Sequence, residues 1–209
     1  FHGAMWSSRV EKKYVTYGIG APAAVLTADR LRADGLTTTF TVRQHGKRLG
    51  EVTLRVPGEH NVRNALAALA VGLELEVPFA TLAAALDRFE GVQRRFQPKG
   101  TAAGVMVIDD YGHHPTEVAA TLAGARAGWP GPLWVVFQPH RYTRTQELHR
   151  EFGGAFGAAD RIFLLDIYPA SEAPIPGVTS RLIADELVRR GKTVELADKE
   201  TIAAQLEGQ

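Results

Sequence analysis

The sequence predicts an α/β protein: a Rossmann-like, mostly parallel sheet over the second half, preceded by a smaller α+β segment. From about Gly104, short apolar runs recur roughly every 30 residues, which is the spacing of βαβ units. These runs begin near Val105, Leu133, Ile162 and Thr193. Helical patterns lie between them, at residues 115–126, 145–158 and 180–190. The runs are continuously apolar, as expected for parallel strands with helices on both faces.

The first part of the chain reads as mixed α and β. Residues 13–18 (KYVTYG) predict a short strand. Apolar and polar residues alternate through residues 37–56 on both sides of HGKRLG, which predicts a hairpin. Residues 97–104 (QPKGTAAG) have the composition of a linker.

Two helices are predicted between the hairpin and this linker. Pro57-Gly58 ends the preceding strand, and Asn61 is a suitable N-cap for the first helix. The apolar face of this helix consists of Ala65, Leu66, Leu69 and Leu73. The second helix starts near Pro78, with Phe79, Leu82, Leu86 and Phe89 on one side.

The composition narrows the class of protein. The chain has 209 residues, of which 45% are hydrophobic and 22% charged, enough for one large or two small globular domains. Its net charge of +1 gives no global indication of nucleic acid or an anionic membrane as partner. The absence of cysteine excludes disulfides, thiolate zinc sites and a cysteine nucleophile.

Targeting signals are not evident in the sequence. No apolar run approaches the ~20 residues of a membrane span, and the start lacks a signal-peptide core. We expect a cytoplasmic protein. The first five residues, Phe1–Met5 (FHGAM), are interpreted as a cloning remnant and left out of the fold prediction.

Polar clusters follow three of the predicted parallel strands. They are Asp109-Asp110-Tyr111, Gln138-Pro139-His140-Arg141 and Asp166-Ile167-Tyr168. In an open parallel sheet the carboxyl ends of the strands share one edge, where ligands bind. The topology therefore predicts that these clusters converge on one site.

The loop after the first of these strands is only partly explained as a helix start. Pro115 suits a first helical turn, and Glu117 complements the helix dipole. Neither role accounts for Tyr111 or for the two histidines. No metal-binding spacing is present, so we expect His113 to contact a ligand and His114 to cap or pack.

The basic loop predicts an anion site. Arg141 and Arg144 are three residues apart at a helix start, and His140 precedes them. Cations are unfavourable at this end of the helix dipole, whereas two guanidinium groups there suit a carboxylate or phosphate.

Other polar residues allow two interpretations each. Asn64 has poor helix propensity in an alanine-rich helix, so it either contacts a base edge or bridges to another segment. Arg94 and Arg95 follow a helix, where they either complement its dipole or meet an anion. The chain has no phosphate loop, because Glu186 stands where RRGKT would need a glycine.

Taken together, these stretches resemble the Mur ligase family. The resemblance is carried by PGEHNVRNALAA, FEGVQRRF, DDYGHHPTEV, FQPHRYTRT and DIYPASEAPIPGV, which occur in the family's order from Pro57 to Val178. It implies three domains in the whole protein, for a UDP-sugar, for ATP, and a C-terminal Rossmann-like domain. On this basis residues 6–98 correspond to the end of the central domain, and residues 99–209 to a truncated C-terminal domain.

The resemblance also implies an activity. HRYTR is similar to the family member that joins L-alanine to the muramyl carboxylate of UDP-N-acetylmuramate in peptidoglycan precursor synthesis. ATP phosphorylates the carboxylate, and the amine attacks the acyl phosphate to give an amide, ADP and phosphate. The implied cofactors are ATP and Mg²⁺, with the magnesium ligands expected in the missing part. We therefore expect this chain to be inactive alone.

Roles follow for residues at matching positions. The resemblance implies ATP contacts for Asn61, Asn64, Arg95, Asp110 and Tyr111. It implies that His113, Arg141 and Arg144 hold the amino-acid carboxylate and the muramyl end, with His140 supporting them. The acidic loop would then be half of a site that closes when the C-terminal domain swings over bound ATP.

Two other functions remain open at this point. One is a different amide ligase of the superfamily, such as the peptide-recycling muramate ligase or a folate–glutamate ligase. The other is a non-catalytic module that binds a nucleotide or sugar nucleotide. The convergence of Asp, His and Arg residues argues against a purely structural protein.

Overall fold

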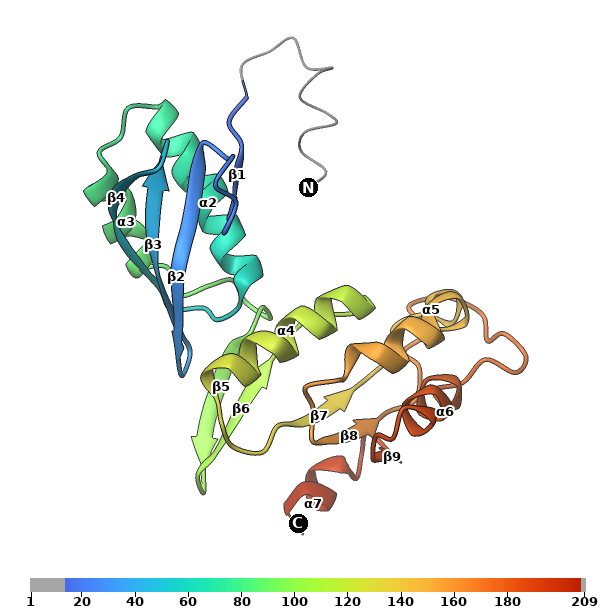
Figure 1. The fold of residues 1–209 in the computed structure, drawn as a ribbon. Helices are drawn as coiled ribbons and strands as arrows, with labels where there is room; N and C mark the ends of the chain where they lie inside the picture. Colours follow the sequence, from blue (N-terminus) through green and yellow to red (C-terminus); the bar gives the residue numbers. More distant parts are fainter. Residues whose placement is uncertain (1–13, 208–209) are drawn as a thin grey trace. The chain divides into compact units, whose positions relative to one another are not determined.

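The computed structural model describes residues 14–207, so the Phe1–Met5 stretch interpreted as a cloning remnant lies outside the described residues (Figure 1). The chain divides into two compact units. The first comprises residues up to Asp109 together with Ala127–Trp129, and the second comprises Asp110–Arg126 and the residues from Pro130 onward. No helix within residues 14–207 is long and apolar enough to cross a membrane.

The first unit is built on a four-stranded sheet in the order β1-β2-β3-β4. Its strands are β1 (Tyr17–Ile19), β2 (Leu26–Asp34), β3 (Thr37–Gln44) and β4 (Lys47–Leu54). The predicted hairpin is confirmed as β3 and β4, whose turn residues His45 and Gly46 have φ of 49° and 77°. Two left-handed residues are the signature of a type I′ turn, which matches the twist of the strands it joins.

The strand β2 was not predicted. It pairs with β3 across a two-residue connection, because Asp34 lies opposite Thr37. The register shifts between Asp29 and Arg32, so the inside–outside alternation is broken halfway along the strand. The Asp34-Gly35 dipeptide is the turn signal that could have revealed this hairpin.

Two helices follow the sheet as predicted, α2 (Glu59–Glu74) and α3 (Phe79–Asp87). The prediction that Asn61 is the N-cap is wrong. The helix begins earlier, with Gly58 at the N-cap position and φ of 98°, a conformation that glycine adopts without strain. The Asn61 side-chain amide instead donates a hydrogen bond to the Pro57 carbonyl, 2.7 Å away.

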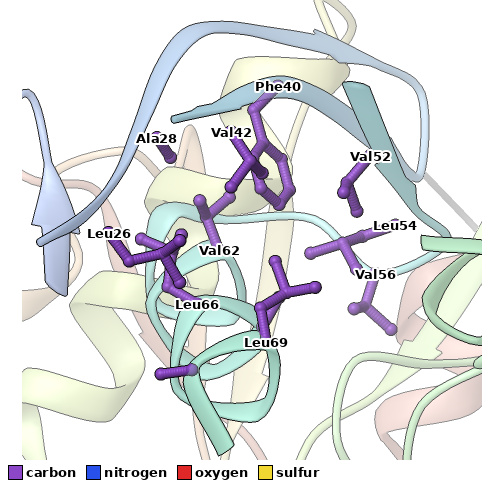
Figure 2. Close-up of a cluster of buried hydrophobic side chains, with 12 residues drawn as sticks. Leu26, Ala28, Phe40, Val42, Val52, Leu54, Val56, Val62, Leu66 and Leu69 are labelled. Carbon is purple, nitrogen blue, oxygen red and sulfur yellow. The ribbon is translucent and has the colours of Figure 1, made fainter. Parts of the chain in front are cut away.

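The core of the first unit lies between the sheet and α2. Figure 2 shows the side chains of Phe40, Val42 and Leu54 directed toward Leu66 and Leu69 of the helix. The predicted apolar faces are confirmed, since Ala65, Leu66 and Leu69 are buried and Leu73 packs against them. The second helix adds Phe79, Leu82 and Leu86 to this cluster. The prediction of Phe89 on the same face is wrong, because α3 ends at Asp87 and 45% of the Phe89 surface is exposed. Burial of each large apolar side chain contributes roughly 1.5–3 kcal/mol.

The expected four-strand parallel sheet is corrected to three strands. The run at Val105 forms β6 (Val105–Asp109), which pairs antiparallel with β5 (Gln97–Ala102) in a separate two-stranded sheet. Residues 97–102, whose composition resembles a linker, are therefore a strand. The reason is local: Ala103 and Gly104, at φ of 48° and 80°, form a tight left-handed turn that returns the chain on itself.

The second unit contains the parallel sheet, in the order β7-β8-β9. The strands β7 (Trp134–Phe137), β8 (Arg161–Leu164) and β9 (Val194–Leu196) confirm three of the four predicted runs. The helices are α4 (Pro115–Gly128), α5 (Tyr142–Ala155), α6 (Arg181–Arg189) and α7 (Ile202–Glu207). Of these, α5 starts and ends three residues before the predicted 145–158.

Aromatic packing holds α5 against the sheet of the second unit. Phe137 at the end of β7 contacts Phe152 and Phe156, with ring centroids 5.3 Å apart in both pairs. Ile183 and Leu187 of α6 complete this cluster. The C-terminal end of α5 is therefore packed against the end of β7.

The core of the first unit leads to a stability prediction. Leu69→Ala removes a fully buried side chain from α2, and we expect a loss of roughly 2–5 kcal/mol in the free energy of unfolding. Val71→Ala is the matched control, because Val71 lies on the same helix with 62% of its surface exposed. Urea unfolding followed by circular dichroism measures both. Equal effects of the two substitutions would contradict the packing described for α2.

Candidate functional site

The loops after β7 and β8 are joined through their backbones. The Tyr168 N–H donates to the Pro139 carbonyl at 2.8 Å, and the Arg141 N–H donates to the Tyr168 carbonyl at 2.8 Å. His140 and Tyr168 thereby form a parallel bridge beyond the ends of the named strands. Two of the three polar clusters expected at one edge of the sheet therefore meet.

The third cluster joins them through its aromatic residues. The His140 ring stacks on Tyr168, with centroids 5.5 Å apart and planes 28° apart. His113 lies 6.0 Å from His140, and Tyr111 lies 5.2 Å from His113. These four residues form a ring row, Tyr111–His113–His140–Tyr168, that draws on all three loops. The convergence holds even though β6 does not belong to the parallel sheet.

Arg141 begins α5 in an unusual backbone conformation. Its φ of 76° and ψ of 140° are strained for a residue with a side chain and cost of order 1–3 kcal/mol. Hydrogen bonds on both sides hold it there. Its N–H donates to Tyr168, and its carbonyl accepts from the N–H (3.2 Å) and hydroxyl (2.9 Å) of the buried Thr145. The exposed Arg141 side chain therefore projects from a fixed backbone.

Arg144 is held by His140. One terminal nitrogen of its guanidinium lies 3.2 Å from His140 Nδ1 and 3.3 Å from the His140 carbonyl oxygen. A guanidinium only donates hydrogen bonds, so Nδ1 must be the acceptor and the imidazole carries its proton on Nε2. Burial lowers the pKa of His140 below its ordinary value of 6.5, and the charges of Arg144, Arg141 and His113 lower it further. His140 is therefore neutral at pH 7.

A carboxylate that the sequence interpretation missed lies beside these arginines. Glu172 accepts hydrogen bonds from the N–H and the hydroxyl of Thr143, at 3.0 and 2.7 Å. These bonds lower the pKa of Glu172. The chain thus supplies an anion at the start of α5, which offsets part of the unfavourable charge that predicted a bound ligand. The only sequence signal was an acidic residue within the stretch DIYPASEAPIPGV.

The loop that carries the first two rings is ordered by Glu117. The Glu117 carboxylate accepts from the N–H groups of His113 and His114, at 3.0 and 3.3 Å, and so caps α4. His114 Nδ1 accepts from the Thr116 N–H at 3.3 Å, which confirms the expected capping role. Asp110 accepts from the Gly112 N–H at 2.7 Å, which tightens the turn.

His113 has a defined tautomer in this loop. Its Nδ1 lies 3.0 Å from the Tyr111 carbonyl oxygen, which can only accept. Nδ1 therefore carries the proton when the imidazole is neutral, and Nε2 is left as an acceptor. The half-buried side chain is well suited to accept a hydrogen bond from an amine or hydroxyl.

The remaining candidate residues belong to the first unit. Asn61 is half-buried and bonded to Pro57, whereas Asn64 is exposed on α2. Arg95 is exposed after α3, and its N–H donates to the Val92 carbonyl. Their predicted contacts with ATP stay predictions. Within residues 14–207, no three His, Asp or Glu side chains come together as a metal site requires.

Two stretches of the chain match models of known protein families. Residues 94–209 match the family model described as the Mur ligase glutamate ligase domain, and residues 2–72 match the Mur ligase middle domain. The UDP-N-acetylmuramate–L-alanine ligase of Pelobacter propionicus is 51% identical over 185 residues, which is 88% of this chain and 40% of that protein. The enzyme of the same name from Geobacter sp. strain M21 is 49% identical over 202 residues, 95% of this chain and 44% of the relative.

Solved structures agree with this family. The UDP-N-acetylmuramate–alanine ligase of Thermotoga maritima has a TM-score of 0.74 and 31% identity, covering 88% of this chain and 39% of that structure. A murein peptide ligase from Psychrobacter arcticus shares the fold, with a TM-score of 0.58 at 22% identity over 94% of this chain and 41% of the other. The chain spans about two fifths of the length of the relatives it matches.

The ionisation of His140 provides a test of the site geometry. Arg144→Ala removes a positive charge and a donor to Nδ1, so we expect the pKa of His140 to rise toward 6.5. Titration of the His140 ring by NMR measures the change. In the unsubstituted chain the folded pKa is below the unfolded one, so His140 contributes full stability above pH 6.5. That contribution is lost as the pH falls from 6.5 through the folded pKa.

A control separates this contact from the general charge of the chain. Arg150→Ala removes an exposed arginine from the same helix, and the His140 titration should not change. A His140 pKa at or above 6.5 in the unsubstituted chain would contradict the arrangement of His140 and Arg144.

Proposed function

The chain belongs to the Mur ligase family, and we propose that it is part of an ATP-dependent ligase that joins L-alanine to the muramyl carboxylate of UDP-N-acetylmuramate. The observation that carries the proposal is the arginine pair at the start of α5, with Arg144 held by a neutral His140. Relatives with the corresponding name are about half identical to this chain. The product would be a peptidoglycan precursor, and the reaction would take place in the cytoplasm.

The proposed reaction has two steps. The γ-phosphoryl group of ATP passes to the muramyl carboxylate, giving an acyl phosphate and ADP. The amine of L-alanine then attacks the acyl carbon, a C–N bond forms, phosphate leaves, and the amine nitrogen loses a proton. Such reactions depend on positioning and on cationic groups near developing negative oxygens.

We assign the amino-acid end to the second unit. Arg141 and Arg144 bind the carboxylate of L-alanine and face the muramyl end, with His140 holding Arg144. His113 offers Nε2 to the amine, because its Nδ1 is engaged with the Tyr111 carbonyl. Two guanidinium groups suit a carboxylate because each presents paired N–H donors in a fixed plane.

Nucleotide contacts are proposed for five residues. Those of the first unit are Asn61, Asn64 and Arg95, and those of the second are Asp110 and Tyr111. The exposed amide of Asn64 and the exposed ring of Tyr111, 42% of whose surface is accessible, suit contacts with the adenine or ribose. Mg²⁺ supplies charge neutralisation in phosphoryl transfer, but residues 14–207 hold no cluster that fits it, and we assign no metal ligand there.

The domain assignment follows from the same family. We propose that residues 6–98 belong to the middle domain and residues 99–209 to the C-terminal domain. Because the sequence contains no phosphate loop, we propose that turnover requires the rest of the enzyme. A peptide-recycling ligase is the second candidate, and the lower identity to the murein peptide ligase disfavours it.

The proposal predicts turnover only in a longer protein. The chain alone and the same chain extended upstream through its natural reading frame are each given ATP, Mg²⁺, UDP-N-acetylmuramate and L-alanine. We expect phosphate release from the extended protein only. Arg141→Ala and Arg144→Ala should each reduce kcat/KM by about 10²-fold, because each removes a guanidinium group that binds the carboxylate of L-alanine. Arg150→Ala, on the same helix, is the matched control and should leave turnover unchanged.

Other outcomes would assign the chain differently. Turnover by the chain alone would show that the missing part is not required. Turnover with a muramyl-linked peptide donor but not with L-alanine would favour the peptide-recycling ligase. No turnover with any amino acid or peptide, together with binding of a nucleotide or sugar nucleotide, would favour the non-catalytic module.

A further inference from the structure

Glu172 reaches back from the loop after β8 to the start of α5. One carboxylate oxygen accepts from the Thr143 N–H at 3.0 Å, and the other accepts from the Thr143 hydroxyl at 2.7 Å. Both oxygens therefore engage one residue, and that residue lies between Arg141 and Arg144. The first N–H groups of a helix have no partner within the helix, so this carboxylate satisfies one that would otherwise depend on solvent.

The loop that delivers Glu172 is tied down at both ends. At its beginning, Tyr168 exchanges backbone hydrogen bonds with Pro139 and Arg141 and stacks on His140. At its end, Glu172 binds Thr143. We call residues 168–172 the return loop. The return loop is thus hydrogen-bonded to residues 139–143 on both sides of the strained Arg141.

The path of the return loop is itself strained. Ala170 and Ser171 are consecutive non-glycine residues with φ of 48° and 72°, in the left-handed region. The Glu172 N–H closes the turn by donating to the Pro169 carbonyl at 3.0 Å. Such conformations persist where surrounding contacts enforce them, and they cluster at functional sites. Here the strain directs Glu172 back to α5.

Glu172 offsets part of the positive charge at the start of α5. Two arginines at a helix N-terminus repel each other and oppose the helix dipole. Glu172 supplies the opposite charge: Arg141 contributes to lowering its pKa, and Glu172 in turn acts to raise the pKa of His140. The groups that face His140 are therefore Arg144, Arg141, His113 and Glu172. Without Glu172, the first turn of α5 would carry cations alone.

We propose that Glu172 is a positioning residue for amino-acid binding. By holding Thr143 it fixes the first turn of α5, and so fixes the relative placement of the Arg141 and Arg144 guanidinium groups that take the substrate carboxylate. That the ligand is L-alanine rests on the proposed function, whereas the positioning role rests on the contacts of Glu172 with Thr143. A preorganised pair binds more tightly because less motion is lost when the ligand arrives.

Loss of Glu172 is expected to weaken the binding of L-alanine without slowing the chemical step. The carboxylate of L-alanine does not react, so its contacts are the same in the ground state and the transition state. Loss of such uniform binding raises KM and leaves kcat unchanged. The KM for ATP should also stay unchanged, because Glu172 is assigned no part in nucleotide binding.

The positioning can be measured on this chain without any ligase assay. In Glu172→Ala we expect hydrogen exchange of the Thr143 amide to accelerate at least about tenfold, because the N–H loses its acceptor. Glu172→Gln keeps an acceptor oxygen and should show less acceleration, while both substitutions lower the pKa of His140. Glu151→Gln, an exposed acid on α5, is the control and should change neither quantity. Unchanged exchange at Thr143 in Glu172→Ala would overturn the proposal.

The substrate part is tested on the protein extended upstream. Glu172→Ala should raise the KM for L-alanine about tenfold, with kcat and the KM for ATP within about twofold. Thr143→Val should raise the KM for L-alanine less, because it loses the hydroxyl but keeps the N–H. Thr143→Ser keeps both donors and should leave the KM for L-alanine unchanged. An unchanged KM for L-alanine in an active enzyme would overturn the inference and leave the proposed function intact. An inactive unsubstituted enzyme would overturn the proposed function, and with it the ligand named here, while amide exchange still decides the positioning.

Discussion

The backbone pairing of Pro139 and Arg141 with Tyr168 is the interaction on which the site depends. Through it the end of β7 and the loop after β8 become one rigid element, although the strands themselves end earlier. It holds Arg141 at a positive φ that an isolated chain would avoid. As a result, α5 begins at a fixed point, and the arginine pair projects from a scaffold set by the aromatic core beneath it.

Electrostatics adds a second constraint. Arginines at a helix start are unfavourable, so their neighbours must avoid further positive charge. His140 satisfies this because it accepts a hydrogen bond from Arg144 and is neutral at pH 7, whereas His113 donates from Nδ1 to the Tyr111 carbonyl. Glu172 and Glu117 supply negative charge on either side, each as a helix cap. The same two carboxylates thus cap the helices and offset part of the positive charge.

The first unit is held together mainly by its hydrophobic core rather than by hydrogen-bonded loops. Its four-stranded sheet packs one face on α2, and ion pairs such as Arg32–Glu51 and Arg63–Glu59 lie exposed on its surface. Asn64 and Arg95 are exposed on this rigid frame. Exposed polar groups on a well-packed helix or just beyond one are available to a ligand at little conformational cost.

The sequence by itself determined the elements whose signals are local. Apolar periodicity defined the faces of α2 and α3, the βαβ rhythm located β7, β8 and β9, and the loop motifs located the ring row and the arginines. Tertiary structure decided the rest. The bulge in β2 depends on its partner strand β3, and the bonds of Glu172 and the ionisation of His140 depend on neighbours from other loops. Contacts between residues far apart in the chain leave no local pattern, because each partner alone looks like an ordinary polar loop residue.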